Sequence, residues 1–441
     1  MKESSQETTH DPAVDKSVVG QGGLGSSGGG FEDRKLSHLG LIIIFGIFAT
    51  TLAQPQTLGR LPITFLLKDQ LHIGKEEISR FFFLCGLAWY FKPVAGILVD
   101  AFPLFRTRRR WYMIIGATLA CASWIAIAFV PKTYTSLLYT SIVINAFMVI
   151  ASTATGAFLV EAGQSMGATG RLTALRLFVQ NFCTLIQGPL GGWLASGAFA
   201  IAAGANAFFI LTMVPIAYFF LRERPQEVNN AQAFANAGRQ LKIIGKSGTL
   251  WFAIIFIGLF YFAPGFGTPL TFRQSDELHF SKQFIGTLGS FGGGAGILAA
   301  VVYGFLTKRI ALRPLMFFGV AAAASGTLFY LLYNNSVSAM LIDSQNGFFF
   351  TLAELTLLDL AARATPKGCE GLGYSLILSM RNVALFGADW VGSYLADDKG
   401  PHWSFSKLVF LNAGTTAFVL ILIPLLPSAI MRSRDRDQAT G

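Results

Sequence analysis

Twelve long apolar runs, separated by short polar segments, dominate this sequence of 441 residues. Each run approaches the roughly 20 apolar residues that an α-helix needs to cross a bilayer. Charged residues make up 13% of the chain, whereas about 25% is usual in a soluble domain. We therefore predict an all-α integral membrane protein with twelve transmembrane helices and no separate soluble domain of ordinary size.

The runs fall into two groups of six, divided by a polar segment that follows Leu221. A Gly/Ser-rich stretch from Gly20 to Gly30 precedes the first group, and such a composition cannot bury a core. We expect five regions along the chain: a disordered cytoplasmic tail (1–35), a six-helix bundle (36–222), a cytoplasmic linker (223–247), a second six-helix bundle (248–431) and a cytoplasmic tail (432–441).

The basic residues are spread unevenly over the loops between these runs. Alternate loops hold dense groups, such as residues 106–110 and 432–436, while the other loops hold scattered lysines such as Lys68, Lys132 and Lys399. Because cytoplasmic loops of membrane proteins carry the excess of Lys and Arg, the dense set and both termini should face the cytoplasm. The membrane would be the cytoplasmic or plasma membrane, or an organellar inner membrane.

A seven-residue pattern occurs once in each half of the chain. Residues 69–75 follow the first run and residues 276–282 follow the seventh, with Asp, Leu, His and Lys at matching positions. Parallel repeats of this kind are related by an axis along the membrane normal. The pattern therefore predicts two related six-helix halves.

The sequence carries no motif for several other classes of protein. No metal-ligand cluster, no phosphate-binding loop of the type G-x-x-x-x-G-K-[ST] and no nucleophile motif is present. The net charge of +10 follows from loops at the ends of apolar runs and does not indicate a nucleic-acid partner. We expect no metal, no cofactor and no enzymatic activity, and a monomer in the lipid bilayer.

Two segments carry a more specific pattern. The first half has Leu61-Pro62, then Lys92-Pro93, Gly96, Asp100, Phe102-Pro103 and an arginine cluster before Tyr112; the second half has Ala362-Arg363, Pro366, Gly368, Glu370 and then Ser379-Met380-Arg381-Asn382. Together these motifs resemble the folate–biopterin transporter family, a branch of the major facilitator superfamily. The resemblance extends over nearly the whole chain after residue 38.

The resemblance implies a major facilitator fold and a secondary active transporter that works by alternating access. The cargo would be a small organic solute, such as a folate- or pterin-like organic anion, moved with protons by a symporter or by exchange. Two positions depart from the family pattern. Gly156 stands where family members usually carry an acidic residue, and Leu172-Thr173 stands where they tend to have Leu-Gln.

Two alternatives stay open on the sequence. One is a membrane sensor or assembly factor that uses a transporter fold without flux. The other is an integral-membrane enzyme, for which the sequence offers no catalytic motif.

Polar side chains within the apolar runs are the candidates for binding the solute or a proton. A charge at the centre of a membrane helix costs on the order of 2.5–3.5 kcal/mol, so it tends to face a cavity, a partner or a pathway. The candidates are Gln54, Lys92, Glu161, Arg176, Gln180, Tyr261, Arg363, Arg381 and Asp389.

Each candidate of the first half has a functional and a structural interpretation. Lys92 would contact an anion or form a charge pair at a helix break. Glu161 would load and release a proton, or form a salt bridge with Arg171 or Arg176. Arg176 begins a polar stripe with Gln180 one turn later, which suits a carboxylate or a planar heterocycle but also interhelical hydrogen bonds.

The candidates of the second half are equally open. Asp359 and Arg363 are four residues apart on one helix and would neutralise each other. Because Arg363 belongs to the family motif, the resemblance implies a gate or structural residue first and a ligand second. Arg381 and Asp389 would form a buried pair or a binding element.

Prolines are expected to break the first and seventh helices. Gln54 precedes Pro55 and Tyr261 precedes Pro264. In the major facilitator fold that the resemblance implies, the first and seventh helices line the central cavity, so both side chains would lie at its wall.

A group of gating candidates lies at the cytoplasmic end of the second run. Asp100 closely precedes Arg106, Arg109 and Arg110. The spacing predicts an ionic latch that would be closed in one state and broken in another, whereas the arginines alone would act as positive-inside anchors.

Overall fold

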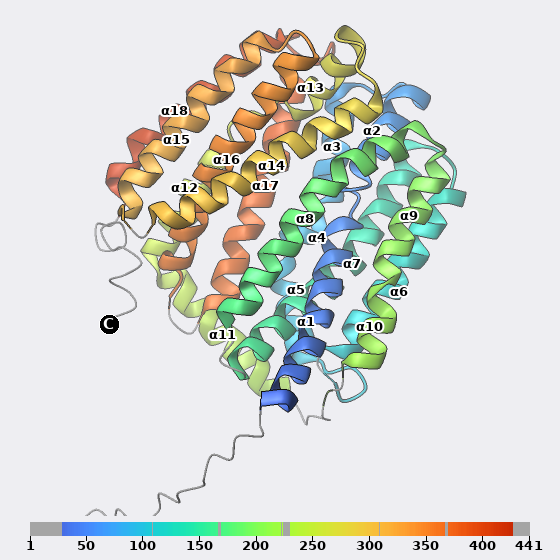
Figure 1. Cartoon of the computed structure of the whole chain (residues 1–441), viewed down its shortest axis with the longest axis vertical. Coiled ribbons are helices and arrows are strands. Elements are labelled where there is room, and N and C mark those ends of the chain that lie inside the picture. The colour runs from blue at the N-terminus through green and yellow to red at the C-terminus, as the bar shows by residue number, and fades with distance from the viewer. Residues whose placement is uncertain are drawn as a thin grey trace, which may run out of the picture. The chain divides into compact units, whose positions relative to one another are not determined.

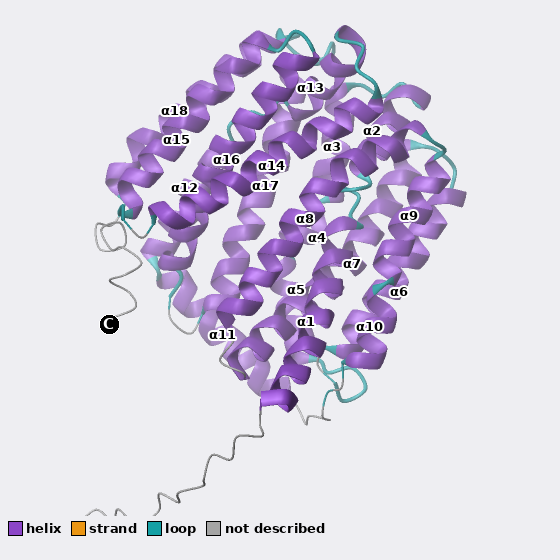
Figure 2. Cartoon of the chain, in the orientation of Figure 1, coloured by secondary structure: helices purple, strands orange, loops and turns teal. Residues whose placement is uncertain are grey.

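The computed structural model describes residues 29–107, 109–165, 169–221, 223, 230–307, 309–366 and 369–426. Within these residues every regular element is helical, and no strand occurs (Figure 2). The chain divides into two units, residues 1–38 and 39–441, and the packing described below belongs to the second. Most of the tail predicted at residues 1–35 lies outside the described residues, but its last part is helical, because the first helix begins at Gly29.

The helices of the first half occupy the blue-to-green part of Figure 1. They are α1 (Gly29–Leu52), α2 (Arg60–Phe65), α3 (Lys75–Cys85), α4 (Leu87–Tyr90), α5 (Lys92–Ala101), α6 (Arg110–Phe129), α7 (Tyr134–Ser165), α8 (Thr169–Ser196), α9 (Phe199–Leu211) and α10 (Met213–Phe220). A π-helical turn, η1 (Leu66–Gln70), follows α2.

The predicted linker 223–247 contains a helix, α11 (Asn230–Lys246), which meets the next helix at 76°. The helices that follow are α12 (Gly248–Tyr261), α13 (Gly267–Phe272), α14 (Lys282–Leu306), α15 (Leu312–Leu328), α16 (Ser336–Ala364), α17 (Glu370–Ala396) and α18 (Phe405–Leu422). Short turns accompany them: the π-helical η2 (Arg273–Glu277) and the 3₁₀ turns η3 (Phe329–Leu332) and η4 (Ile423–Leu425).

Six segments among the described residues are long and apolar enough to cross a bilayer. They are Arg110–Phe129, Tyr134–Ala162, Phe199–Phe220, Lys282–Leu306, Leu312–Leu332 and Phe405–Leu425. Helices α8, α16 and α17 have 28, 29 and 27 residues, which exceeds the roughly 20 that a bilayer requires, but they carry charged residues. The chain is a multi-pass membrane protein, and the count of twelve spans stays a prediction.

The sequence repeat corresponds to a structural repeat. Helices α2 and α13 each have six residues, and each leads into a π-helical turn. The histidines at matching repeat positions, His72 and His279, both have a positive φ, 52° and 54°. Helices α3 and α14 then begin at the two repeat lysines, Lys75 and Lys282. The predicted relationship between the halves is therefore confirmed in the backbone.

The first helix breaks where the proline predicts. Helix α1 ends at Leu52, and α2 begins after the turn that contains Pro55. The hydroxyl of Thr57 donates to the carbonyl oxygen of Leu52 at 2.6 Å. The backbone N–H of Leu58 donates to the same oxygen at 3.2 Å, so two groups of the turn satisfy a carbonyl at the end of the broken helix.

The seventh predicted helix breaks in the same way, between α12 and α13. The side-chain amide of Asn412 donates to the carbonyl oxygens of Ala263 and Pro264 at 3.3 and 3.0 Å. The backbone N–H of Gly265 donates to the carbonyl oxygen of Ala388 at 2.8 Å. Helices α17 and α18 thus hold the irregular backbone of the break, as a membrane protein requires.

Small residues bring the two halves into close contact along α8 and α14, which lie side by side (Figure 1). Gly188 and Gly192 of α8 face Gly286 of α14, and a Cβ at Gly192 would lie 2.6 Å from the carbonyl oxygen of Lys282. Glycine allows this approach because helices in lipid associate through close packing of small residues.

Candidate functional site

Polar and charged side chains from both halves gather between the halves. We call this group the inter-half cluster; it consists of Lys92 on α5, Arg176 on α8, Tyr261 on α12, Glu354 on α16, and Tyr374 and Arg381 on α17. The six residues come from five different helices, and four of them were predicted from the sequence as candidate site residues.

The second half supplies a compensated ion pair to the inter-half cluster. The guanidinium of Arg381 forms an ion pair and hydrogen bond with the carboxylate of Glu354. It also lies 4.7 Å from the ring centroid of Tyr261. The hydroxyl of Tyr261 donates to the same carboxylate at 2.9 Å. The charge of Arg381 is therefore neutralised within its own half.

The first half supplies cations without a carboxylate. The ammonium of Lys92 donates to the hydroxyl oxygen of Ser152 at 3.2 Å and lies 5.1 Å from the ring of Trp89. Arg176 is within electrostatic range of Lys92 and of Tyr374. Among the residues that the structure describes, no ion pair joins Lys92 or Arg176 to a carboxylate.

The net charge of the inter-half cluster is therefore positive. Three cations face one carboxylate, and that carboxylate is already bound to Arg381. A charge held away from water without a partner costs several kcal/mol, so Lys92 and Arg176 favour an anion in the space that they face. An arginine also offers a bidentate fork to a carboxylate.

Aromatic rings border the same cations. The indole of Trp89 donates to the amide oxygen of Asn145 at 2.8 Å, which fixes the orientation of its ring. The carbonyl oxygen of Trp89 accepts a hydrogen bond from the hydroxyl of Ser379 on α17 at 3.3 Å. Trp89 therefore lies where the halves meet, beside Lys92.

Gly156 leaves open space one helical turn beyond Ser152. A Cβ built at Gly156 would have no atom within 4 Å, and residues four apart on a helix lie on the same face. The position at which the resembled family carries an acid is thus on the side of α7 that Lys92 contacts. Here the ammonium has a hydroxyl as its partner.

Ion pairs tie the two halves together at one end of the bundle, which we call the gate end and define by η1 and η2. Lys68 Nζ lies 2.5 Å from Asp276 Oδ1, and Lys282 Nζ lies 2.6 Å from Asp69 Oδ2. Four ion pairs between the halves occur among the described residues, and all four lie at this end; the other two are Arg60–Asp389 and Glu77–Lys399.

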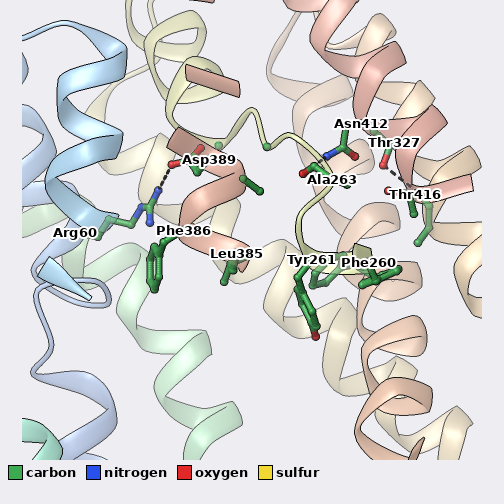
Figure 3. Close-up of a pocket in the computed structure, with 15 residues that line it drawn as sticks. Arg60, Phe260, Tyr261, Ala263, Thr327, Leu385, Phe386, Asp389, Asn412 and Thr416 are labelled. Atoms are coloured by element: carbon green, nitrogen blue, oxygen red, sulfur yellow. Dashed lines mark hydrogen bonds and ion pairs between the residues drawn. The ribbon is translucent and has the colours of Figure 1, made fainter. Parts of the chain in front are cut away.

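Asp389 belongs to the gate end and not to a pair with Arg381. Its carboxylate accepts hydrogen bonds from the backbone N–H and the hydroxyl of Thr268, at 2.9 and 2.7 Å. The guanidinium of Arg60 reaches the same carboxylate from the first half at 3.3 Å (Figure 3). Asp389 thus caps α13 and joins the halves.

A cavity of about 250 Å³ lies beside this contact (Figure 3). Its walls include Arg60, Asp389, Phe386, Tyr261 and Asn412. It is smaller than the roughly 300–1,000 Å³ of most small-molecule sites. The cavity lies mainly within the second half, between the broken helix and α17, and Tyr261 belongs both to its wall and to the inter-half cluster.

A further ion pair of the gate end is exposed to solvent. Lys399 Nζ donates to Glu77 Oε1 at 2.9 Å. This hydrogen bond raises the pKa of Lys399, so the ammonium stays charged at neutral pH. Two hydrogen bonds between the halves lie next to this ion pair. The indole N–H of Trp390 donates to Glu76 Oε1, and the backbone N–H of Glu76 donates to Asp397 Oδ2.

The latch between Asp100 and the gating arginines stays a prediction, and the described contacts of Arg109 and Arg110 are with other residues. Glu161 forms an ion pair of 2.7 Å with Arg109 and not with Arg176, and the side chain of Arg171 lies outside the described residues. Arg110 donates to the carbonyl oxygen of Tyr218 at 2.8 Å. The backbone N–H groups of Arg109 and Arg110 donate to Glu223. Arg106 is exposed, and the side chain of Asp100 lies outside the described residues.

Three other predicted candidates take local positions. Gln54 donates to the carbonyl oxygen of Thr50 in its own helix, next to the break. Gln180 is half-buried on α8, one turn beyond Arg176. Arg363 forms the expected pair with Asp359, with two hydrogen bonds of 2.7 and 2.8 Å.

The sequence reasoning missed the charges of the gate end as functional residues. The signal was present, because Asp69, Asp276 and Lys282 are the charges of the sequence repeat itself. The repeat was interpreted only as evidence of topology. It also missed Glu354 as the partner of Arg381, since the two lie on different helices.

Comparison with known proteins agrees with this geometry. A folate-biopterin transporter from Synechocystis sp. is 26% identical over 416 residues, which cover 86% of this chain and 81% of that protein. Folate transporter 1 from Plasmodium falciparum is 25% identical over 77% of this chain and 70% of its own length. Both relatives are named as transporters and not as enzymes.

Solved structures show the same fold. A D-xylose–proton symporter superposes with a TM-score of 0.66 at 14% identity, over 89% of this chain and 97% of that chain. A POT family transporter in complex with 5-aminolevulinic acid gives 0.67 at 13% identity, over 90% and 96%. The predicted major facilitator fold is therefore confirmed. With a family model matched over residues 55–440, the chain belongs to the BT1 family.

Proposed function

We propose that this chain is a secondary transporter of a planar organic anion of the folate or pterin class, held between the halves by Lys92 and Arg176. The observation that carries the proposal is the positive balance of the inter-half cluster, in which these two cations have no carboxylate partner among the described residues. The names of the relatives support the cargo class.

The chemistry of a folate suits this site in two ways. A folate carries two carboxylates at one end, and Lys92 and Arg176 offer two positive groups within electrostatic range of each other. It carries a flat pteridine ring at the other end, and Trp89, Tyr261 and Tyr374 offer aromatic faces. Offset or edge contacts between such rings contribute about 0.5–1.5 kcal/mol each.

The proposed cycle alternates between closure at the gate end and closure at the opposite end. The structure corresponds to closure at the gate end, since the ion pairs between the halves lie there. Cargo bound to cations of the first half and to Tyr374 or Arg381 of the second would link the halves directly. The short helices α2 and α13, next to the two breaks, would move with the gate.

We further propose that the gate end faces away from the cytoplasm. The basic residues Arg109, Arg110 and Lys246 lie toward the other end, and an excess of Lys and Arg marks the cytoplasmic side. Both termini would then be cytoplasmic, in a monomer with twelve spans. Coupling to protons or exchange would supply the driving force, and the ion pair with Arg109 favours a gating role for Glu161 over proton loading.

Uptake by proteoliposomes tests the proposal. The purified chain would be supplied in turn with folic acid, a pterin and an unrelated aliphatic dicarboxylate. We expect saturable uptake of the folate or pterin that exceeds empty liposomes and the dicarboxylate. Binding of folic acid without any flux would favour the sensor alternative, and uptake of the dicarboxylate alone would contradict the proposed cargo.

A further inference from the structure

A buried carboxylate lies in the second half, apart from the inter-half cluster. Asp343 of α16 accepts a hydrogen bond from the hydroxyl of Tyr330 at 2.8 Å and another from Tyr333 at 2.9 Å, one at each carboxylate oxygen. The two rings are stacked, with centroids 5.5 Å apart and planes 17° apart. Both tyrosines are almost fully buried, at 5% and 0% exposure.

The surroundings of Asp343 are apolar and lack a counter-ion. Buried Leu288, Ile342 and Val409 belong to the same packed cluster as the tyrosines, and α14 presents the glycine backbone of Gly292. Among the described residues, no ion pair involves Asp343. A carboxylate in such a place costs several kcal/mol when charged, and two neutral hydroxyls compensate only part of that cost.

The other titratable and charged groups near Asp343 are few. Asn346 of α16 is a polar neighbour of Tyr330. Arg273 of η2 is within electrostatic range of Tyr333 and donates to the backbone carbonyl oxygen of Tyr333 at 3.3 Å. It also forms an ion pair of 3.6 Å with Glu277. Arg273 thus faces the backbone of the tyrosine and has a carboxylate partner of its own.

A hydrogen bond connects this site to the gate end. The hydroxyl of Tyr333 that donates to Asp343 also accepts a hydrogen bond of 2.6 Å from the side-chain amide of Gln274. Gln274 is buried in η2, two residues before Asp276. Asp276 is the partner of Lys68 across the halves. One chain of contacts therefore runs from the buried carboxylate to an ion pair of the gate.

The structural repeat does not require this connection. The second residue of η1 is Leu67, and the second residue of η2 is Gln274. Leu67 is fully buried and apolar, so the matching position of the first half cannot make this hydrogen bond. The turn therefore forms in one half without the polar connection that the other half has.

We propose that Asp343 is a proton-binding site that controls closure at the gate end through Tyr333 and Gln274. When the carboxylate binds a proton, its new O–H needs an acceptor, and the two tyrosine hydroxyls are the groups in contact. One tyrosine must then accept where it donated before. Because the rings are stacked, a shift of either ring displaces Tyr333, and Gln274 moves η2 and Asp276 with it. Proton binding therefore loosens the gate, and proton release closes it.

This inference rests on the proposed alternating access, and its test reads the gate without any cargo. Spin labels would be attached at Thr133→Cys and Asp398→Cys, two exposed positions at the gate end of different halves. The four native cysteines are buried, so the parent chain without added cysteines is the labelling control. Distances between the labels would be measured in lipid nanodiscs at mildly acidic and mildly alkaline pH.

We expect acid to increase the population with a long distance several-fold. Asp343→Asn, which resembles the protonated acid, should hold the long distance at both pH values. Tyr333→Phe keeps the carboxylate but removes the link to Gln274, so it should abolish the pH response. Asp359→Asn is the matched control, because that carboxylate of α16 is paired with Arg363, and it should respond to pH as the parent does.

Three results separate the proposals. A pH response in Asp343→Asn equal to that of the parent would overturn the proton site and leave alternating access intact. A single distance in every variant and at every pH would contradict the gating cycle itself. A response lost in Asp343→Asn and Tyr333→Phe, and retained in Asp359→Asn, would establish the site.

Discussion

Asp69 and Lys282 belong to different halves of the chain and form an ion pair of 2.6 Å at the gate end. Lys282 also lies 4.7 Å from the ring of Phe65, while Lys75, its counterpart in the repeat, lies 5.8 Å from the ring of Phe272. Each half therefore places its repeat lysine on an equivalent phenylalanine of the other half. Residues of the repeat thus contribute to the gate end from both halves, and the two lysine–phenylalanine contacts are reciprocal.

Charge reversal at this contact should open the gate, and a charge swap should restore it. Both side chains are about one-third exposed, and such pairs contribute roughly 0.2–1 kcal/mol. Lys282→Glu should therefore raise the open population up to about 5-fold, and Lys282→Asp combined with Asp69→Lys should return it toward the parent. Label distances at Thr133 and Asp398 measure the change.

Glu277→Gln is the control for this prediction, because the pair of Glu277 with Arg273 lies within one half. An equal effect of Glu277→Gln would mean that the net charge of the gate end, and not the ion pair between the halves, determines the open population.

The glycine contact between α8 and α14 predicts a steric block. A Cβ at Gly286 would overlap the carbonyl oxygen of Gly188, so Gly286→Val should prevent closure at the gate end and abolish uptake. Gly289→Ala is the control, because its Cβ would lie 3.9 Å from Gly188 Cα, an ordinary contact. Full uptake by Gly286→Val would show that the halves do not approach in this way.

The pair of Arg381 and Glu354 predicts a stability effect. Removal of one partner of a fully buried ion pair costs about 3–5 kcal/mol, and this pair is partly exposed, at 24% for Arg381 and 21% for Glu354. Glu354→Ala should therefore cost less than that figure and still lower the melting temperature in detergent more than Glu77→Ala does, since Lys399, the partner of Glu77, is largely exposed. Equal melting temperatures for the two variants would argue against a stabilising Arg381–Glu354 pair.

Gly156 allows a gain of charge at the inter-half cluster. The open space at this position and its place one turn from Ser152 put a new carboxylate near Lys92. Gly156→Asp should neutralise the ammonium and weaken the binding of an organic anion about 10-fold or more, since hydrogen bonds to charged groups contribute roughly 1.5–3 kcal/mol. Gly156→Asn, which has the same shape without the charge, should bind nearly as the parent does.

The sequence predicted the fold well because membrane insertion constrains composition and spacing. The apolar runs, the proline breaks near Gln54 and Tyr261, and the repeat at Asp69 and Asp276 all follow from local residues. These features indicated helices and two related halves without any knowledge of contacts between distant segments.

The candidate site was only partly predictable, because the spacing of residues along the sequence does not show which side chains of distant helices form pairs. Arg381 and Asp389 share a helix, yet Arg381 pairs with Glu354 and Asp389 with Arg60. The expected partners of Glu161 lie near it in the sequence, whereas its partner in the structure is Arg109, on the loop between α5 and α6. Asp343 gave no signal at all, because its tyrosines become visible as partners only when η3 folds back onto α16.

The affinity for folic acid tests the central claim most directly. Binding would be titrated to the parent chain, to Lys92→Gln and to Arg176→Gln, with the exposed Lys407→Gln as the control. If these cations hold the anion, each of the two variants should bind folic acid about 10-fold or more weakly, while Lys407→Gln should match the parent. Equal affinity in all four proteins would contradict an anion site formed by Lys92 and Arg176.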